Sequence, residues 1–337
     1  MTSATLNPFL QEAIPTPLEL LDQMPLKPIQ EEFIHTSRNT IKAILQGKDR
    51  RKILIVGPCS IHDEQATYEY ALKLKYLSDD VKDHFFIVMR SYFEKPRTSM
   101  GWKGFLYDPH LDGSYDIAEG LFRSRQILLE LAHMQVPAGS ELLELNTAPY
   151  LADLLSWSCI GARTCSSPTH RQLAASLSMP IGFKNSTDGD VINAINGILS
   201  ANTPQYFLGM DQNGNLNRIH APGNPDAHLV LRGGDKKPNY DAPSIQEALE
   251  RCRERRVLKK IFIDCAHDNS RKCPENQIKI FQSVMHENNP AVVGLMLESH
   301  LHLGSQPITP LLQYGVSITD PCLDWDSTET LIRNFIQ

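Results

Sequence analysis

Short apolar runs rich in β-branched residues alternate along the chain with segments whose apolar positions recur at helical spacing. This alternation begins at Lys52 and is typical of β–α units that build a parallel sheet. The runs that predict strands are 52–60, 84–93, 136–145, 158–165, 179–186, 228–234, 259–267 and 291–299. The helical candidates between them are 64–80, 118–134, 148–157, 170–178, 188–201, 244–256 and 276–288. The pattern predicts an α/β fold, a (β/α)8 TIM barrel, although a doubly wound open sheet has a similar count.

Other segments fall outside this repeat. Residues 1–50 contain Pro-punctuated segments and then a helical run that ends at Gly47, so we expect an N-terminal extension before a catalytic barrel at 51–337. Residues 204–224 predict an inserted β-hairpin before the sixth strand, because Asn213 and Gly214 form a turn signal. The loop 90–116 is too long for a plain connection and is a candidate binding loop.

Composition and charge limit the class of protein. The 337 residues are 41% hydrophobic, which is enough for a sizeable core. A net charge of −6 supplies no basic field for nucleic acid, so any anion must be bound locally. No run approaches the roughly 20 apolar residues of a membrane span, and the N-terminus lacks a signal-peptide pattern. We therefore expect a cytoplasmic protein with no nucleic-acid or membrane partner.

Each predicted strand ends on or near a residue able to do chemistry, and barrel active sites are built from those ends. In chain order these residues are Cys59, Arg90, Glu141, Arg163, Lys184, Arg232, His267 and Glu298. Any one of them is most simply a polar strand end, but chance explains the whole set poorly. The cations would repel one another unless an anion neutralised them, so the set predicts binding of a phosphate or carboxylate. Lys95, Arg97 and Thr98 form a second cationic cluster, which indicates a second phosphorylated group.

A metal site is a further hypothesis. A thiolate, an imidazole and carboxylates together suit a divalent transition metal better than Mg²⁺ or Ca²⁺. The candidate ligands are Cys59, His267, Glu298 and Asp320. A metal there would polarise a carbonyl oxygen as a Lewis acid. Glu141 and Asp264 are candidates for proton transfer or for orienting ligands and cations.

Several long motifs occur in an order that points to one family: VGPCSIHD, MRSYFEKPRTSMGWKG, IGART, GFKNSTDG, LRGG, ESHL and SITD. From about residue 15 onward the chain resembles 3-deoxy-D-arabino-heptulosonate 7-phosphate (DAHP) synthase of the aromatic-amino-acid-sensitive type. The resemblance implies an aldol-like condensation of phosphoenolpyruvate (PEP) with erythrose 4-phosphate, which gives DAHP and phosphate and opens the shikimate pathway. It also implies a barrel assembled as a homodimer or homotetramer.

The resemblance implies roles for particular residues. The PEP site matches Arg90, Glu141, Ala162, Arg163, Lys184 and Arg232. The aldose phosphate motif matches Lys95, Pro96, Arg97 and Thr98. The metal ligands match Cys59, His267, Glu298 and Asp320, for Mn²⁺, Fe²⁺, Co²⁺ or Zn²⁺. The expected catalytic residues are Lys95, His267, Glu141 and Asp264.

The chain departs from the family pattern in three segments, one of which has the order Gly-Ser-Glu at 139–141 where a small-Gly-Glu run is usual. ARTCSSPTHRQ stands where ARTTESQxHRE is usual, with Ser166 replacing an acid and Pro168 a Gln. CAHDNS replaces the usual FSHANS around His267. We expect loss of the acid to remove an orienting partner of nearby cations, which affects rate or substrate preference rather than the residues that touch substrate.

Regulation and three other functions stay open. An aromatic amino acid effector is a hypothesis, because related enzymes bind one beside the hairpin near Ser178, where this chain has Ala148, Pro149 and Gly209. The chain could instead condense PEP with arabinose 5-phosphate or another phosphorylated aldose, although KPRT and GWKG favour the shorter one. A non-catalytic regulatory paralogue would explain ARTCSSPTH. A metal aldolase that does not use PEP would give Arg163, Lys184 and Arg232 no carboxylate and phosphate to bind.

Overall fold

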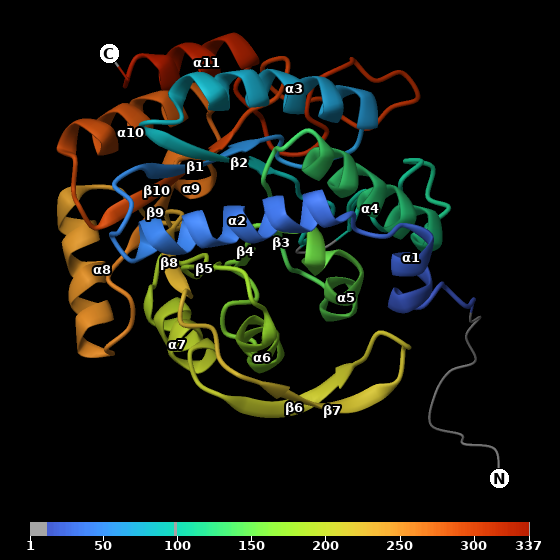
Figure 1. Cartoon of the computed structure of the whole chain (residues 1–337). Helices are drawn as coiled ribbons and strands as arrows, with labels where there is room; N and C mark the ends of the chain where they lie inside the picture. The colour runs from blue at the N-terminus through green and yellow to red at the C-terminus, as the bar shows by residue number, and fades with distance from the viewer. Residues whose placement is uncertain (1–11, 98–99, 337) are drawn as a thin grey trace.

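The computed structural model describes residues 12–97 and 100–336, and its centre is a closed barrel of parallel strands (Figure 1). The barrel strands, in chain order, are β1 (Lys52–Gly57), β2 (Phe85–Arg90), β3 (Ala138–Glu141), β4 (Trp157–Ile160), β5 (Ile181–Lys184), β8 (His228–Leu231), β9 (Ile261–Asp264) and β10 (Val292–Glu298). Because β1 pairs with both β2 and β10, the sheet has no free edge. The predicted (β/α)8 barrel is confirmed, and the open sheet is excluded.

Helices surround the barrel. They are α3 (Glu64–Val81), α4 (Ile117–His133), α5 (Ala148–Leu151), α6 (Pro168–Ser176), α7 (Ile192–Ala201), α8 (Ala242–Glu254), α10 (Pro274–Glu287) and α11 (Trp325–Arg333). Side-chain caps start several of them, as where Asp63 accepts a hydrogen bond from the Ala66 backbone at α3. The helix expected at 148–157 is shorter, because the short 3-10 helix Ala152–Leu154 ends it and Trp157 already begins β4. Pro168 occupies the first turn of α6, where its missing N–H costs nothing.

The barrel wall separates two apolar clusters. Leu54 and Val56 pack with residues of the surrounding helices, whereas their neighbours Ile53 and Ile55 face the barrel interior. This alternation is the period of two of a strand. Residues of α2 (Pro28–Leu45) join the interior cluster, so this helix covers the end at which the strands begin (Figure 1). The opposite end, where the strands finish, is left for a site.

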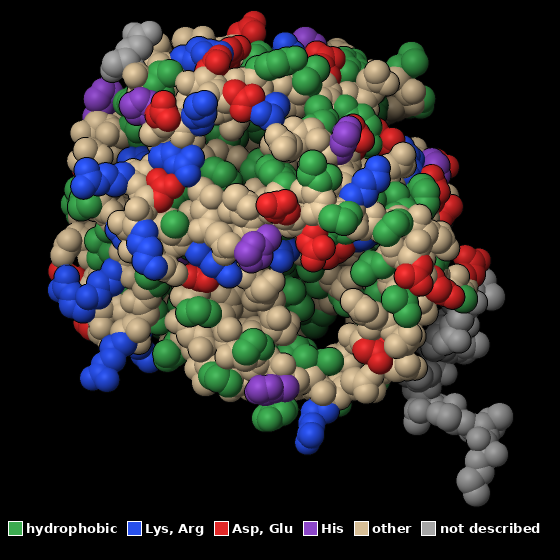
Figure 2. Space-filling view, viewed as in Figure 1, with side chains coloured by type: hydrophobic (Ala, Val, Ile, Leu, Met, Phe, Trp, Pro, Cys, Tyr) green, Lys and Arg blue, Asp and Glu red, His purple; other side chains and the backbone are tan. Residues whose placement is uncertain are grey.

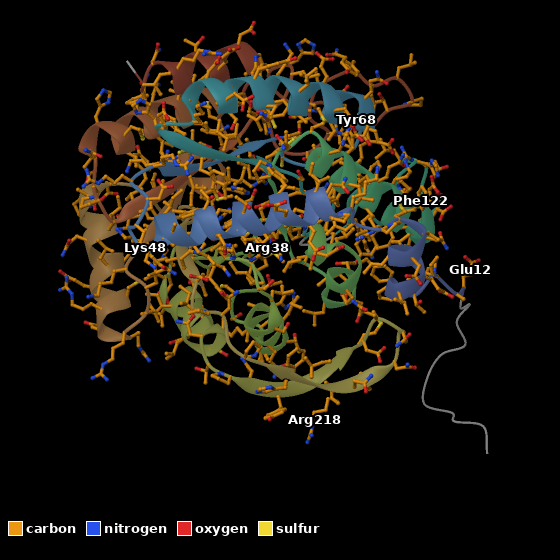
Figure 3. All side chains as sticks on the ribbon, in the orientation of Figure 1. Glu12, Arg38, Lys48, Tyr68, Phe122 and Arg218 are labelled. Atoms are coloured by element: carbon orange, nitrogen blue, oxygen red, sulfur yellow. The ribbon has the colours of Figure 1, made fainter. Side chains whose placement is uncertain are left out.

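The predicted inserted hairpin is confirmed. β6 (Gln205–Met210) pairs antiparallel with β7 (Leu216–Ala221), and the turn between them contains Gly214 with a φ of 78°. The hairpin curves beneath α6 and α5, and Arg218 points away from the barrel (Figures 1 and 3). In the N-terminal extension, α1 (Pro17–Gln23) lies against the turn of the hairpin. There the Leu18 N–H donates to the Gln212 carbonyl at 2.8 Å. The boundary at residues 50 and 51 stays a prediction.

None of the helices in the described ranges combines the length and apolar character that a membrane crossing requires.

Candidate functional site

A polar cavity of about 400 Å³ opens where the barrel strands end. Loops that follow β2, β3, β4, β5, β8, β9 and β10 form its wall. The residues expected from the sequence that line it are Lys95, Pro96, Arg97, Glu141, Ala162, Arg163, Lys184, Arg232, His267 and Asp320. Thr98 lies outside the described residues. The barrel therefore brings cations of both predicted clusters to one cavity.

Four other residues expected from the sequence lie beneath this wall rather than on it: Cys59, Arg90, Asp264 and Glu298. The Arg90 guanidinium donates to Glu298 Oε1 at 2.8 Å and stacks 3.7 Å from the centre of the Tyr92 ring. Its Nε also donates to the Pro58 carbonyl at 3.1 Å. Arg90 is thus enclosed by protein, one layer below the cavity.

Asp264 connects two cavity residues from below. Its Oδ2 lies 3.1 Å from Lys184 Nζ and 2.9 Å from His267 Nδ1. Burial alone would raise the pKa of Asp264, but the charges of His267, Lys184 and Arg90 outweigh it and hold that pKa well below its usual value. Asp264 therefore stays ionised at neutral pH, which suits it to orient the two side chains.

Three possible metal-binding side chains meet beside Lys95. One ligand atom each from Cys59, Glu298 and Asp320 lies within 4.8 Å of the others. His267 is outside this group, but its Nε2 lies 3.7 Å from Glu298 Oε1. Lys95 Nζ donates to Cys59 Sγ at 3.1 Å, and burial together with the Glu298 charge raises the pKa of the thiol against the opposing Lys95 and Arg90 charges. A sulfur and two carboxylates this close fit a divalent transition metal.

Buried asparagines that the sequence reading missed hold the strand ends in place. Asn185 Oδ1 accepts from the Arg232 backbone N–H at 2.8 Å, and Asn239 Oδ1 accepts from the Gly233 N–H at 2.7 Å. Asn269 Nδ2 donates to the Asp264 carbonyl at 2.8 Å. Each of these amides follows a strand-end motif in the sequence, which was the available signal. Together they join the ends of β5, β8 and β9.

The sequence reading also missed charged residues of the cavity wall. Asp268 forms an ion pair with Arg232, and Lys272 Nζ lies 3.1 Å from Asp320 Oδ1. Thr187, Asp235 and Thr319 complete the polar lining. All of them stand beyond the predicted strand ends, so strand periodicity carried no signal for them.

The departing segment 165–172 is tied to the barrel by other contacts. Ser166 is exposed. Arg171 donates to the carbonyls of Cys165 at 2.9 Å and Asn193 at 3.0 Å. His170 bridges Ser167 Oγ and the Leu143 carbonyl, each at 2.8 Å. Backbone carbonyls thus hold the nearby cation Arg171.

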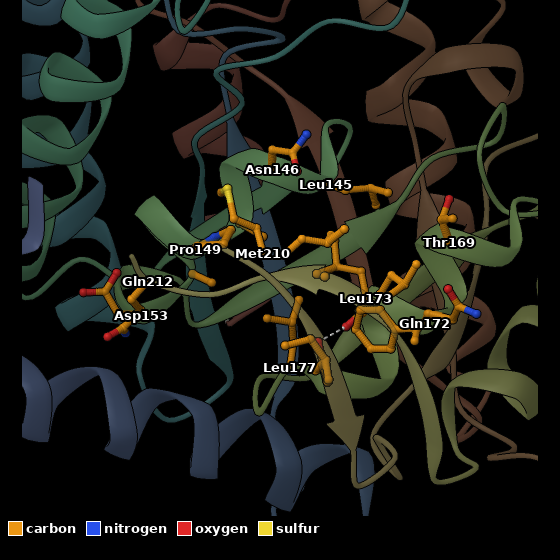
Figure 4. A pocket seen from close by; sticks show the side chains of 18 of the residues that line it. Leu145, Asn146, Pro149, Asp153, Thr169, Gln172, Leu173, Leu177, Met210 and Gln212 are labelled. Atoms are coloured by element: carbon orange, nitrogen blue, oxygen red, sulfur yellow. Dashed lines mark hydrogen bonds between the residues drawn. The ribbon is translucent and has the colours of Figure 1, made fainter. Parts of the chain in front are cut away.

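A second cavity of about 400 Å³, mostly apolar, lies between the hairpin and the helices above it, where the surface is hollowed (Figure 2). Leu173 and Leu177 line it on one side and Met210 of the hairpin on the other (Figure 4). Its other lining residues include Leu145, Ala148, Pro149, Phe207 and Gly209. Ser178 is not part of this lining; its Oγ accepts from Arg38 at 3.1 Å.

Comparisons with known proteins agree with this architecture. The model of the DAHP synthetase I family matches residues 28–333. The chain is 43% identical over 333 residues to the Tyr-sensitive phospho-2-dehydro-3-deoxyheptonate aldolase of Escherichia coli (strain K12). The aligned region covers 97% of this chain and 93% of the relative. The chain is 42% identical over 327 residues to the Trp-sensitive enzyme of the same strain, covering 96% and 94%.

The fold is similar to a solved structure as well. A phospho-2-dehydro-3-deoxyheptonate aldolase from Francisella tularensis SCHU S4 superposes with a TM-score of 0.96 at 38% identity, covering 98% of this chain and 97% of that one. The family model spans the extension from α2 onward and the whole barrel. This chain therefore belongs to the DAHP synthetase I family.

Proposed function

We propose that this chain condenses PEP with erythrose 4-phosphate to give DAHP and inorganic phosphate, the first step of the shikimate pathway. The observation that carries the proposal is one cavity with two cationic groups: Lys184 and Arg232 on one part of its wall, and Lys95 and Arg97 on another. Two anionic substrates must meet for this reaction, and like charges at a barrel mouth are stable only when anions neutralise them.

Arg163, Lys184 and Arg232 bind the carboxylate and phosphate of PEP in this proposal. Arg offers two parallel donors to an anion, and Lys adds a point charge. Glu141 lies against the Gly161 backbone, where any Cβ would clash with its carboxylate. Gly161 therefore allows the Glu141 carboxylate to stay at the PEP side of the cavity. Arg97 and Lys95 bind the aldose phosphate, with Pro96 between them.

The reaction joins the enol carbon of PEP to the aldehyde carbon. A divalent ion held by Cys59, Glu298, Asp320 and His267 would polarise the aldehyde oxygen as a Lewis acid. Burial alone would lower the pKa of Lys95, but the neighbouring Cys59 and Glu298 outweigh it and raise that pKa, so Nζ keeps its proton to donate to the developing oxygen. Water then adds to the former enol C2, and the bond from C2 to the phosphate oxygen breaks.

Release of inorganic phosphate from PEP tests this proposal. We expect release with erythrose 4-phosphate, much slower release with arabinose 5-phosphate, and none after EDTA until Mn²⁺ is restored. Faster turnover of arabinose 5-phosphate than of erythrose 4-phosphate would favour the alternative condensation of PEP with arabinose 5-phosphate. Absence of phosphate release with every aldose and every added divalent metal would contradict an enzymatic function.

We further propose that an aromatic amino acid binds in the hairpin cavity and inhibits the enzyme. Two relatives are named Tyr-sensitive and Trp-sensitive, and the cavity is large and apolar enough for one aromatic ring. A homodimer or homotetramer is also proposed.

Ser176→Phe tests the effector site, because Ser176 on α6 lines the cavity and a phenyl group there would fill it. We expect inhibition by millimolar Phe, Tyr or Trp to weaken at least about tenfold, while uninhibited turnover is retained. Dose–response curves measure this. If none of the three amino acids inhibits the wild type, or if Ser176→Phe is inhibited as strongly as the wild type, the effector proposal is wrong.

A further inference from the structure

Three of the buried cations around the cavity are each paired with a carboxylate. Arg90 pairs with Glu298, Lys184 with Asp264, and Arg232 with Asp268. These carboxylates differ in burial: the side chains of Glu298 and Asp264 are 3% and 1% exposed, whereas that of Asp268 is 23% exposed. Only the last of these pairs stands in contact with solvent, so it is the one that a ligand can open at low cost.

Contacts to other groups also distinguish the three acids. Asp264 is held by His267 and by the Ala266 N–H, which donates to its Oδ1 at 3.0 Å. Glu298 belongs to the group that fits a metal ion. Asp268, in contrast, lines the polar cavity with its side chain paired to Arg232.

Asp268 also borders a second surface that carries cations. Asp268 lines the polar cavity and also a neighbouring cavity of about 550 Å³. The wall of this second cavity carries Lys236, Lys237 and Arg271. A carboxylate that leaves Arg232 therefore has positive charge to face in its new position. This lowers the electrostatic cost of displacement.

We infer that Asp268 is a displaceable counter-ion for Arg232. Its carboxylate pairs with the Arg232 guanidinium until a phosphate group replaces it. The inference rests on the proposed function, because it assigns the replacing group to the phosphate of PEP. Competition from the carboxylate lowers the affinity of the site for phosphate, and its return to Arg232 helps the product phosphate to leave. Asp268 thus tunes phosphate affinity without touching the reacting carbon atoms.

Binding of inorganic phosphate to the metal-loaded enzyme, measured by isothermal titration calorimetry, tests the inference. We expect Asp268→Asn, which keeps the shape and removes the charge, to bind phosphate about three- to tenfold more tightly. The KM for PEP should fall by a similar factor, and the inhibition constant for phosphate should fall with it. Asp268→Glu, which keeps the charge, should behave as the wild type.

A matched control separates a local effect from a change of net charge. Asp79→Asn makes the same charge change at the surface pair of Lys75 and Asp79 on α3, and it should leave phosphate binding unchanged. Pyruvate, which lacks the phosphate, should bind equally to wild type and Asp268→Asn. Thermal melting checks that each variant is folded, and Asp268→Ala serves as a second neutral variant.

The outcomes distinguish this inference from the proposed function. Equal or weaker phosphate binding by both neutral variants, in folded protein that still turns over PEP, overturns the counter-ion role alone, since weaker binding would mean that Asp268 merely positions Arg232. A wild type that binds neither PEP nor phosphate and releases no phosphate overturns the proposed function itself.

Discussion

Lys184→Met is expected to lower kcat/KM for PEP by at least about a hundredfold. Lys184 Nζ lies 3.1 Å from Asp264 Oδ2, and both side chains are almost fully buried at the end of their strands. Met retains the length of the side chain but removes the charge that the PEP anion would meet. It also leaves the buried Asp264 carboxylate with one cation fewer, and truncating one partner of such a pair costs about 2–5 kcal/mol.

Steady-state kinetics with varied PEP, alongside thermal melting, measure the effect. Lys75→Met provides the control, because Lys75 makes an exposed pair with Asp79 on α3. This substitution should change neither kcat nor the KM for PEP by more than about twofold. Saturation by PEP that is unchanged in a folded Lys184→Met enzyme would remove Lys184 from the PEP site and favour a metal aldolase that does not use PEP.

Cys59→Ala is expected to weaken metal binding by at least about a hundredfold, and metal-dependent activity should fall with it. The substitution removes the soft ligand and leaves only carboxylates and an imidazole, which hold a transition metal less tightly. Lys95 Nζ would also lose its sulfur partner. Metal content after dialysis, and titration of Mn²⁺ against a chelator, measure the loss without relying on turnover.

Cys252→Ala is the matched control, because this thiol is buried in α8 and does not line the cavity. It should retain metal like the wild type and lose only some stability. Equal metal affinity in Cys59→Ala and Cys252→Ala would place the metal away from Cys59. Glu298 and Asp320 would then not share a metal with this thiol.

Much of the fold was predictable because its signals are local. The period of two in β1 and the helical period of α3 are written in neighbouring residues, and Asn213 with Gly214 marked the hairpin turn. Boundaries were less accurate where tertiary pairing decides them. Trp157 was expected to end a helix, yet it pairs with Gly139 and begins β4. The helix of the N-terminal extension starts at Pro28, because proline suits a first turn.

The sequence by itself determined the residue types at the strand ends, and therefore that cations, acids and a thiol would meet at one mouth of a barrel. That conclusion needs only the strand period and the rule that parallel strands end together. Only the tertiary structure decided which of them touch. It placed Arg90 below the cavity, put Asp264 between Lys184 and His267, and brought Asp268 to Arg232. The reason is physical: contacts of a few ångströms depend on barrel register and on the loops after each strand, and neither has a periodic signal in the chain.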